Sequence, residues 1–126
     1  MLDKILSFIA DRLGVDWVVE KDTSGTWEYT KWNSGKIKLT TKVRLSNNNV
    51  SATGSAYYSK HGYDLPTSIA LTSIDNIQGE LRSDWIGGIT VDPKSTLSKI
   101  NFCCWTTRNS SRDGFEIYLE VEGKWK

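Results

Sequence analysis

The sequence predicts a mainly β protein, an antiparallel β-sandwich of about seven strands with a short N-terminal α-helix. Two long runs, residues 36–45 and 115–125, alternate apolar and polar side chains as half-buried strands do. Clusters of Asn, Ser, Gly and Asp separate further apolar runs at short intervals. No helical pattern comes between these runs, which favours antiparallel pairing over a parallel α/β sheet.

Residues 27–45 predict a β-hairpin. The turn cluster Asn33-Ser34-Gly35 separates an aromatic-rich run, residues 27–32, from the alternating run, residues 36–45. One face of the second run is apolar and the other is strongly basic. The first face holds Ile37, Leu39, Thr41, Val43 and Leu45, and the second holds Lys36, Lys38, Thr40, Lys42 and Arg44.

The last predicted strand has an acidic face. Its inward residues are Phe115, Ile117, Leu119, Val121, Gly123 and Trp125, and its outward residues are Glu116, Tyr118, Glu120, Glu122 and Lys124. Beside the basic strand it would form cross-strand ion pairs, each worth a few tenths of a kcal/mol to about 1 kcal/mol. The alternative is that the basic face binds teichoic acid, another anionic glycan or nucleic acid.

Four further strands are predicted between these two, at residues 50–58, 68–81, 85–91 and 97–107. Turns are expected at residues 60–66 and 109–114. Within residues 68–81 the apolar residues change parity, which predicts a β-bulge or a break between Ser73 and Asn76.

The N-terminal segment, residues 1–14, predicts a short amphipathic helix ahead of the sandwich domain, residues 15–126. Its apolar side chains recur at helical spacing, and Gly14 follows as a C-terminal cap. A helix this short is marginal alone in water, so its stripe must dock. We expect self-association through a trimer interface, and the alternative is packing on the chain's own strands. The stripe consists of Leu2, Ile5, Leu6, Ile9 and Leu13.

Composition limits the remaining classes of function. The chain has 126 residues and a formal net charge of +1, which fits one domain and gives no overall field to attract nucleic acid or a membrane. Cys103 and Cys104 are adjacent, so we expect two free thiols. No Cys/His cluster offers a metal site, no cofactor motif is present, and His61 is the single histidine. No nucleophile elbow or phosphate-binding glycine loop occurs, and we expect no enzymatic activity.

Several short motifs resemble one protein family. Val18-Val19-Glu20, residues 23–27, residues 29–35 and the closing Gly123-Lys124-Trp125-Lys126 resemble the C-terminal domains of tail-fibre and minor structural proteins of phages and prophages of Gram-positive bacteria. These commonly open on V-V-E-x-G-T-S-G-x-W-x-Y-x-K-W-x-S-G and end on G-R-W-K. Lys21-Asp22 and Lys124 depart from the usual residues without changing the strand pattern. The resemblance implies a virion role and says little about a ligand.

Aromatic residues suggest where a ligand would bind. Six tryptophans and five tyrosines exceed what one small core readily buries, and a group near the predicted turn mixes aromatic rings with polar side chains. Sugars present apolar C–H faces to rings and hydroxyls to polar groups. The alternative is that Tyr57 and Tyr58 alternate across a strand while the others decorate a loop. The candidate residues are Tyr57, Tyr58, Lys60, His61, Tyr63, Asp64, Trp85 and Arg108.

These observations predict a trimeric tail-fibre domain that binds a host cell-surface glycan or teichoic acid and contacts other tail proteins. The N-terminus lacks the apolar segment of a signal peptide, so we expect synthesis in the host cytoplasm and incorporation into the virion tail. The alternative is a purely architectural virion protein, either a trimer cap or a tail connector, with no ligand.

Overall fold

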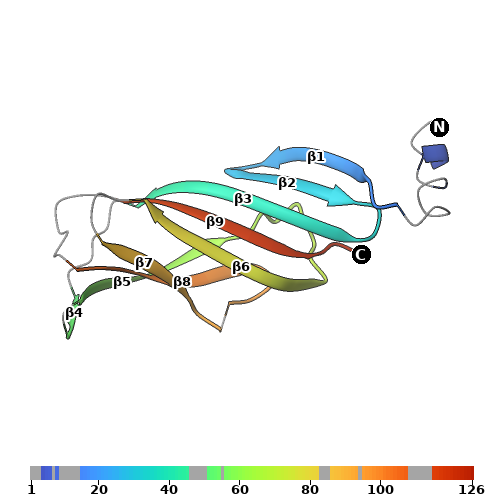
Figure 1. The fold of residues 1–126 in the computed structure, drawn as a ribbon. Helices are drawn as coiled ribbons and strands as arrows, with labels where there is room; N and C mark the ends of the chain where they lie inside the picture. Colours follow the sequence, from blue (N-terminus) through green and yellow to red (C-terminus); the bar gives the residue numbers. More distant parts are fainter. Residues whose placement is uncertain are drawn as a thin grey trace.

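Two antiparallel sheets face each other in the computed structural model (Figure 1). The structure describes residues 4–6, 8, 15–45, 51–54, 56–82, 86–93, 95–107 and 115–126. One sheet has the strand order β1-β2-β3-β9-β6 and the other β4-β5-β8-β7, which confirms the mainly β sandwich. The strands are β1 (Val18–Ser24), β2 (Trp27–Trp32), β3 (Lys36–Leu45), β4 (Ser51–Thr53), β5 (Ala56–Asp64), β6 (Ser73–Arg82), β7 (Gly87–Val91), β8 (Lys99–Thr106) and β9 (Phe115–Lys124).

The core lies between the sheets and is built by the predicted alternation. Three alternating residues of β3 and three of β9 are buried, and they share the core with inward residues of β8 from the other sheet; those of β3 and β9 are Ile37, Leu39, Thr41, Ile117, Leu119 and Val121. Trp27 is also buried, and its indole Nε1 donates to the carbonyl of Asp64 at 2.9 Å. The fully buried apolar side chains are Ile37, Leu39, Ile100, Cys104, Ile117, Leu119 and Val121.

The basic and acidic strands are neighbours, as one sequence interpretation predicted. In the register of β3 and β9, Lys38 lies opposite Glu122 and Arg44 opposite Glu116. Lys38 Nζ lies 2.6 Å from a carboxylate oxygen of Glu120, and this hydrogen-bonded contact raises the pKa of Lys38. The acidic strand therefore lies beside the basic face and supplies the ion-pair partner of Lys38.

The predicted irregularity in β6 is present. The register of β6 against β9 shifts between Ile74 and Asn76, which is the expected bulge. The strand begins at Ser73 rather than at residue 68, because residues 65–72 turn over the end of the sheets instead of pairing.

The described residues form nine strands rather than about seven. Residues 18–24 pair with β2 as an edge strand, β1, although exposed charged side chains hide its alternation. Residues 50–58, predicted as one strand, divide between β4 and β5 at the turn containing Gly54. The turn predicted at residues 60–66 is wrong, because β5 continues to Asp64 and pairs with β8 throughout. Gly62 in this segment is a strand residue whose open side is covered by Lys99.

The two motif-rich parts of the sequence meet at one end of the sandwich. Asn33 and Trp17 exchange hydrogen bonds of 2.9 Å, from Asn33 N to Trp17 O, and 2.8 Å, from Trp17 N to Asn33 Oδ1. Trp125 donates from Nε1 to Trp32 O at 3.0 Å and from its backbone N to Gly35 O at 2.8 Å. Gly35 has a positive φ of 99°, which suits glycine at this turn. The turn therefore joins the chain's entry into β1 to its final residues.

Part of the predicted N-terminal helix falls within the described residues. Residues 4–6 and 8 are helical, and Ile5, Leu6 and Phe8 are 51%, 42% and 59% exposed. Leu2, Ile9 and Leu13 lie outside the described residues. In the described part of the chain no helix is long and apolar enough to cross a membrane. Cys103 and Cys104 are free thiols, as predicted.

Candidate functional site

The predicted ligand-binding residues lie along β5, and the strand divides them between two faces. In an antiparallel pair, residues opposite each other share a face. Tyr57, His61 and Tyr63 lie opposite Thr106, Phe102 and Ile100, which are buried. Tyr58, Lys60 and Asp64 therefore share the outer face of the four-stranded sheet. Trp85 and Arg108 lie outside the described residues.

Of the inward members of this group, Tyr63 contacts the facing sheet and His61 packs within its own sheet. The Tyr63 ring lies 5.8 Å from the Trp27 ring, and its hydroxyl is hydrogen-bonded to Thr26 Oγ1 of the facing sheet. His61 stacks on Phe102 with ring centroids 5.5 Å apart, and its Nε2 lies 2.7 Å from Ser59 Oγ. Burial lowers the pKa of His61. These contacts are those of core residues.

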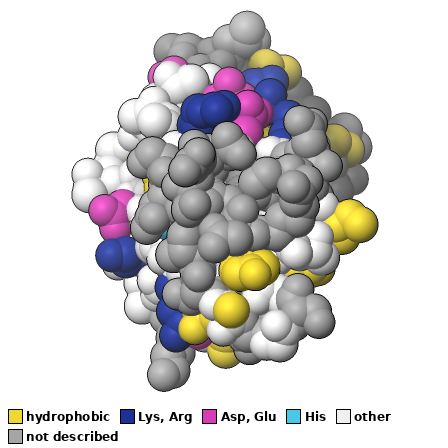
Figure 2. Space-filling model, turned by 90° about the vertical axis from the view of Figure 1, so that its left-hand side faces the viewer, with side chains coloured by type: hydrophobic (Ala, Val, Ile, Leu, Met, Phe, Trp, Pro, Cys, Tyr) yellow, Lys and Arg dark blue, Asp and Glu magenta, His cyan; other side chains and the backbone are white. Residues whose placement is uncertain are grey.

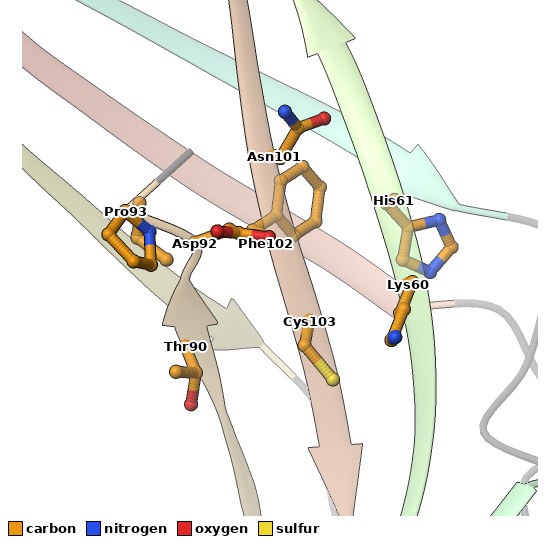
Figure 3. A pocket seen from close by; sticks show the side chains of 9 residues that line it. Lys60, His61, Thr90, Asp92, Pro93, Asn101, Phe102 and Cys103 are labelled. Atoms are coloured by element: carbon orange, nitrogen blue, oxygen red, sulfur yellow. The ribbon is translucent and has the colours of Figure 1, made fainter. Parts of the chain in front are cut away.

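The outer face carries a shallow groove of about 480 Å³ across β5, β8 and β7 (Figure 3). Lys60, Cys103 and Thr90 form one row across the three strands, because Lys60 and Thr90 lie opposite Cys103 on its two sides. Asn101, Asp92 and Pro93 continue the lining beyond this row. His61, Val91 and Phe102 also line the groove, and the alternation of strand residues means that they contribute main chain there.

An aromatic row borders the groove. Trp105 of β8 lies opposite Tyr58 of β5 on one side and opposite Gly88 of β7 on the other, and both rings are half-buried. A Cβ added to Gly88 would lie 3.2 Å from each of three indole atoms of Trp105, namely Cε2, Cζ2 and Nε1. At 3.2 Å from all three atoms this Cβ position lies out of the indole plane, so a face of the ring rather than its edge is turned toward Gly88.

Trp105 is not among the candidate residues predicted from the sequence, and its position on this outer face comes from the structure. The parity of β8 could have indicated it, because Phe102 and Cys104 point inward and Trp105 must point the other way. The partner Gly88 could not have been found without the register of β7.

The groove carries the cation Lys60, which has no opposing charge next to it among the described residues. The side chain opposite Lys60 is Cys103, and no carboxylate of the described residues lies within 4.0 Å of Lys60 Nζ. Lys99, in contrast, lies opposite Asp64 in the register. Burial raises the pKa of the Cys103 thiol, and nearby Lys60 opposes this shift. The groove thus offers an ammonium group, an amide, a hydroxyl and a carboxylate beside flat apolar rings.

The other described surfaces offer less distinctive chemistry. Seen from the end of the sandwich away from the chain termini, Figure 2 shows side chains of both charges next to one another. On the five-stranded sheet two polar hollows of about 280 and 540 Å³ share Glu28 and Thr40, and their lysines lie among threonines and glutamates. Among the described residues no group of three or more His, Cys, Asp or Glu side chains could hold a metal ion.

No protein family matches the sequence, and no curated protein matches it. Solved structures of pyocin tail fibres do match the fold. An N-truncated R1-type pyocin tail fibre superposes with a TM-score of 0.57 over 93% of this chain and 94% of that chain, at 10% identity. The chain has the fold of a pyocin tail-fibre domain.

Two longer fibre structures agree with this likeness. A C-terminal fragment of the P. aeruginosa R1 pyocin fibre matches with a TM-score of 0.57 and 11% identity over 90% of this chain and 30% of that chain. An N-truncated R2-type fibre matches with a TM-score of 0.52 and 10% identity over 91% and 41%. In these longer fibres the shared fold accounts for less than half of the chain.

Proposed function

We propose that the chain is a non-enzymatic tail-fibre domain of a phage or prophage of Gram-positive bacteria, trimeric, and that it binds a host cell-surface saccharide. The fold shared with pyocin tail fibres over nearly the whole chain carries the proposal. The tail-fibre-like motifs at the two ends of the sandwich sequence add support, because the structure brings them together around Asn33 and Trp125. The virion tail is the expected location, after synthesis in the host cytoplasm.

Exposed apolar side chains support the trimer. Ile5 and Leu6 of the N-terminal stripe and the neighbouring Phe8 are each more than two-fifths exposed, and Val15 ahead of β1 is 52% exposed. Trp17 lies at the same end, and its indole Nε1 is buried without an acceptor among the described residues. Sister subunits packed around this end would cover the stripe and could supply that acceptor.

The outer groove supports saccharide binding. It lies on a sheet face rather than in a deep cavity, so a single copy would bind weakly. Three copies on one fibre gain avidity without new contacts, and this makes a weak site sufficient for adhesion. Of the residues predicted from the sequence, Tyr58, Lys60 and Asp64 remain candidates on this face, whereas Tyr57, His61 and Tyr63 face inward.

The second candidate is an architectural virion domain without a ligand, which would cap a trimer or connect to other tail proteins. The observation in its favour is the inward packing of His61 and Tyr63. Three of the six candidate residues that the structure describes then face the core, as expected for an architectural domain.

A polysaccharide array separates the two candidates. The fluorescently labelled full chain is applied to immobilised bacterial surface polysaccharides, teichoic acids included, at its native oligomeric state. Receptor binding predicts saturable retention on a subset of glycans that free glycan competes away. An oligomer that is retained on none of them would favour the architectural role.

A further inference from the structure

We propose that Trp105 is the stacking platform of the saccharide site and that the site takes an acidic saccharide, whose anionic group is held by Lys60. The inference rests on the proposed function, since it assumes that this face binds glycans, and it specifies the residues and the ligand class. It adds Trp105 and Gly88 to the site, and it assigns Lys60 the role of charge partner.

The first step is the placement of the indole. Trp105 is on the outer face, a face of its ring is turned toward Gly88 of the neighbouring strand, and the residue is partly exposed. The opposite ring face is turned away from Gly88. A partly exposed aromatic ring on a sheet surface matches the apolar C–H face of a sugar ring.

The glycine makes this placement possible. Neither Gly88 nor Trp105 has a positive φ, so the main chain there is ordinary strand and glycine is not needed for conformation. What glycine supplies is space, because a Cβ at residue 88 would stand 3.2 Å from three indole atoms and would push the ring away from this position. Glycine inside a strand marks such a close approach.

The second step is the charge beside the platform. Lys60 follows Tyr58 by two residues on the same face of β5, which places its Cα about 7 Å further along the strand. Its opposite residue is the uncharged Cys103, and the described residues place no carboxylate within 4.0 Å of its ammonium. An anionic substituent on the stacked sugar, or on the next unit, would meet this cation.

The remaining groove residues suit hydroxyl recognition. Asn101 and Thr90 offer donors and acceptors, and Asp92 offers a carboxylate at the far side of the groove from Tyr58. The groove therefore has a basic end at Lys60 and an acidic end at Asp92. A saccharide with its acidic group near the aromatic row fits this order, and the reverse orientation would bring two anions together.

The test uses matched glycan pairs that differ only in one hexose or hexuronic acid unit, displayed on one linker and applied to the full chain. Wild type should prefer the acidic member. Trp105→Ala should weaken binding of both members about tenfold, and Lys60→Gln should remove the preference while leaving the neutral member unchanged. Gly88→Ala keeps every ligand-contacting side chain and should fall between wild type and Trp105→Ala. Lys42→Gln, on the basic strand of the other sheet, is the matched control and should bind as wild type does.

The outcomes distinguish a wrong assignment of the site from the absence of saccharide binding. If wild type binds and Trp105→Ala and Lys60→Gln, shown to be folded by thermal melting, bind unchanged, the assignment of the site is overturned while saccharide binding stands. Loss of the acidic preference in Lys42→Gln instead of Lys60→Gln would move the site to the basic face of β3. If wild type binds no glycan, the proposed receptor function falls together with this inference.

Discussion

Truncating Leu119 tests the sandwich core most sharply. Leu119 has no exposed surface and lies in β9, between Thr41 of β3 and Gly79 of β6. Leu119→Ala removes three carbon atoms, which is about 2.4 kcal/mol at roughly 0.8 kcal/mol per buried methylene. The cavity left behind adds to this loss, because close-packed neighbours collapse only in part. We therefore expect the free energy of unfolding to fall by about 3–5 kcal/mol.

The measurement is urea denaturation followed by tryptophan fluorescence, at one fixed protein concentration because assembly also affects stability. In a thermal scan the same loss corresponds to a drop in Tm of roughly 10–15 °C. Glu122→Ala is the control, since Glu122 lies on the outer face of the same strand, and it should change stability by less than about 0.5 kcal/mol. A Leu119→Ala loss as small as that of the control would refute the proposed packing of the two sheets.

Three further predictions concern titratable groups. Burial lowers the pKa of His61 below its ordinary 6.5, so near this pH the unfolded chain binds a proton more readily than the folded chain. The free energy of unfolding should therefore fall as pH drops below about 6.5. Urea melts at several pH values should show this fall in wild type and not in His61→Gln. Hydrogen bonding from Tyr29 lowers the pKa of Glu20 below its ordinary 4.5, so the ionised Glu20 stabilises the fold above pH 4.5 and loses this effect as pH falls through its lower pKa in the folded chain. Glu20→Gln should therefore lower stability at pH 7 and progressively less in acid. An equal loss at both pH values would contradict the contact. Burial raises the pKa of the Cys104 thiol to about 12, and it also raises the pKa of Cys103. An aromatic disulfide reagent should therefore react slowly with Cys103 in the native protein, and with Cys104 only after denaturant is added. Two thiols that react equally fast in the native protein would contradict this burial.

Strands with a single clear alternation could be predicted from the sequence. β3 and β9 keep one parity over ten residues each, and their opposite charges predicted their pairing. The edge strand β1 could not be predicted in this way, because nearly all its side chains are exposed and no burial pattern is imposed on them. Its pairing is set instead by contacts such as the hydrogen bond from Tyr29 to Glu20 at 2.7 Å.

The candidate site was predicted only in part. Lys60, His61 and Gly62 have the composition of a turn, so the sequence predicted that the strand ends before them. In the structure β5 continues to Asp64, and the side chains of every second residue point inward. Once the strand is known, its parity separates Tyr58 and Lys60 from His61 and Tyr63. The contact of Trp105 with Gly88 depends on the pairing of β7 with β8. That pairing is a property of the whole fold, and no local sequence pattern predicts it.

The central claim is that this fold is displayed as a trimer through its N-terminal apolar stripe. The most direct test is the solution mass by multi-angle light scattering of the full chain, compared with the variant Ile5→Ser, Leu6→Ser, Phe8→Ser. The claim predicts three times the chain mass of 14.2 kDa for wild type and the mass of a single chain for the variant. A wild-type chain that elutes as a monomer of 14.2 kDa would contradict it.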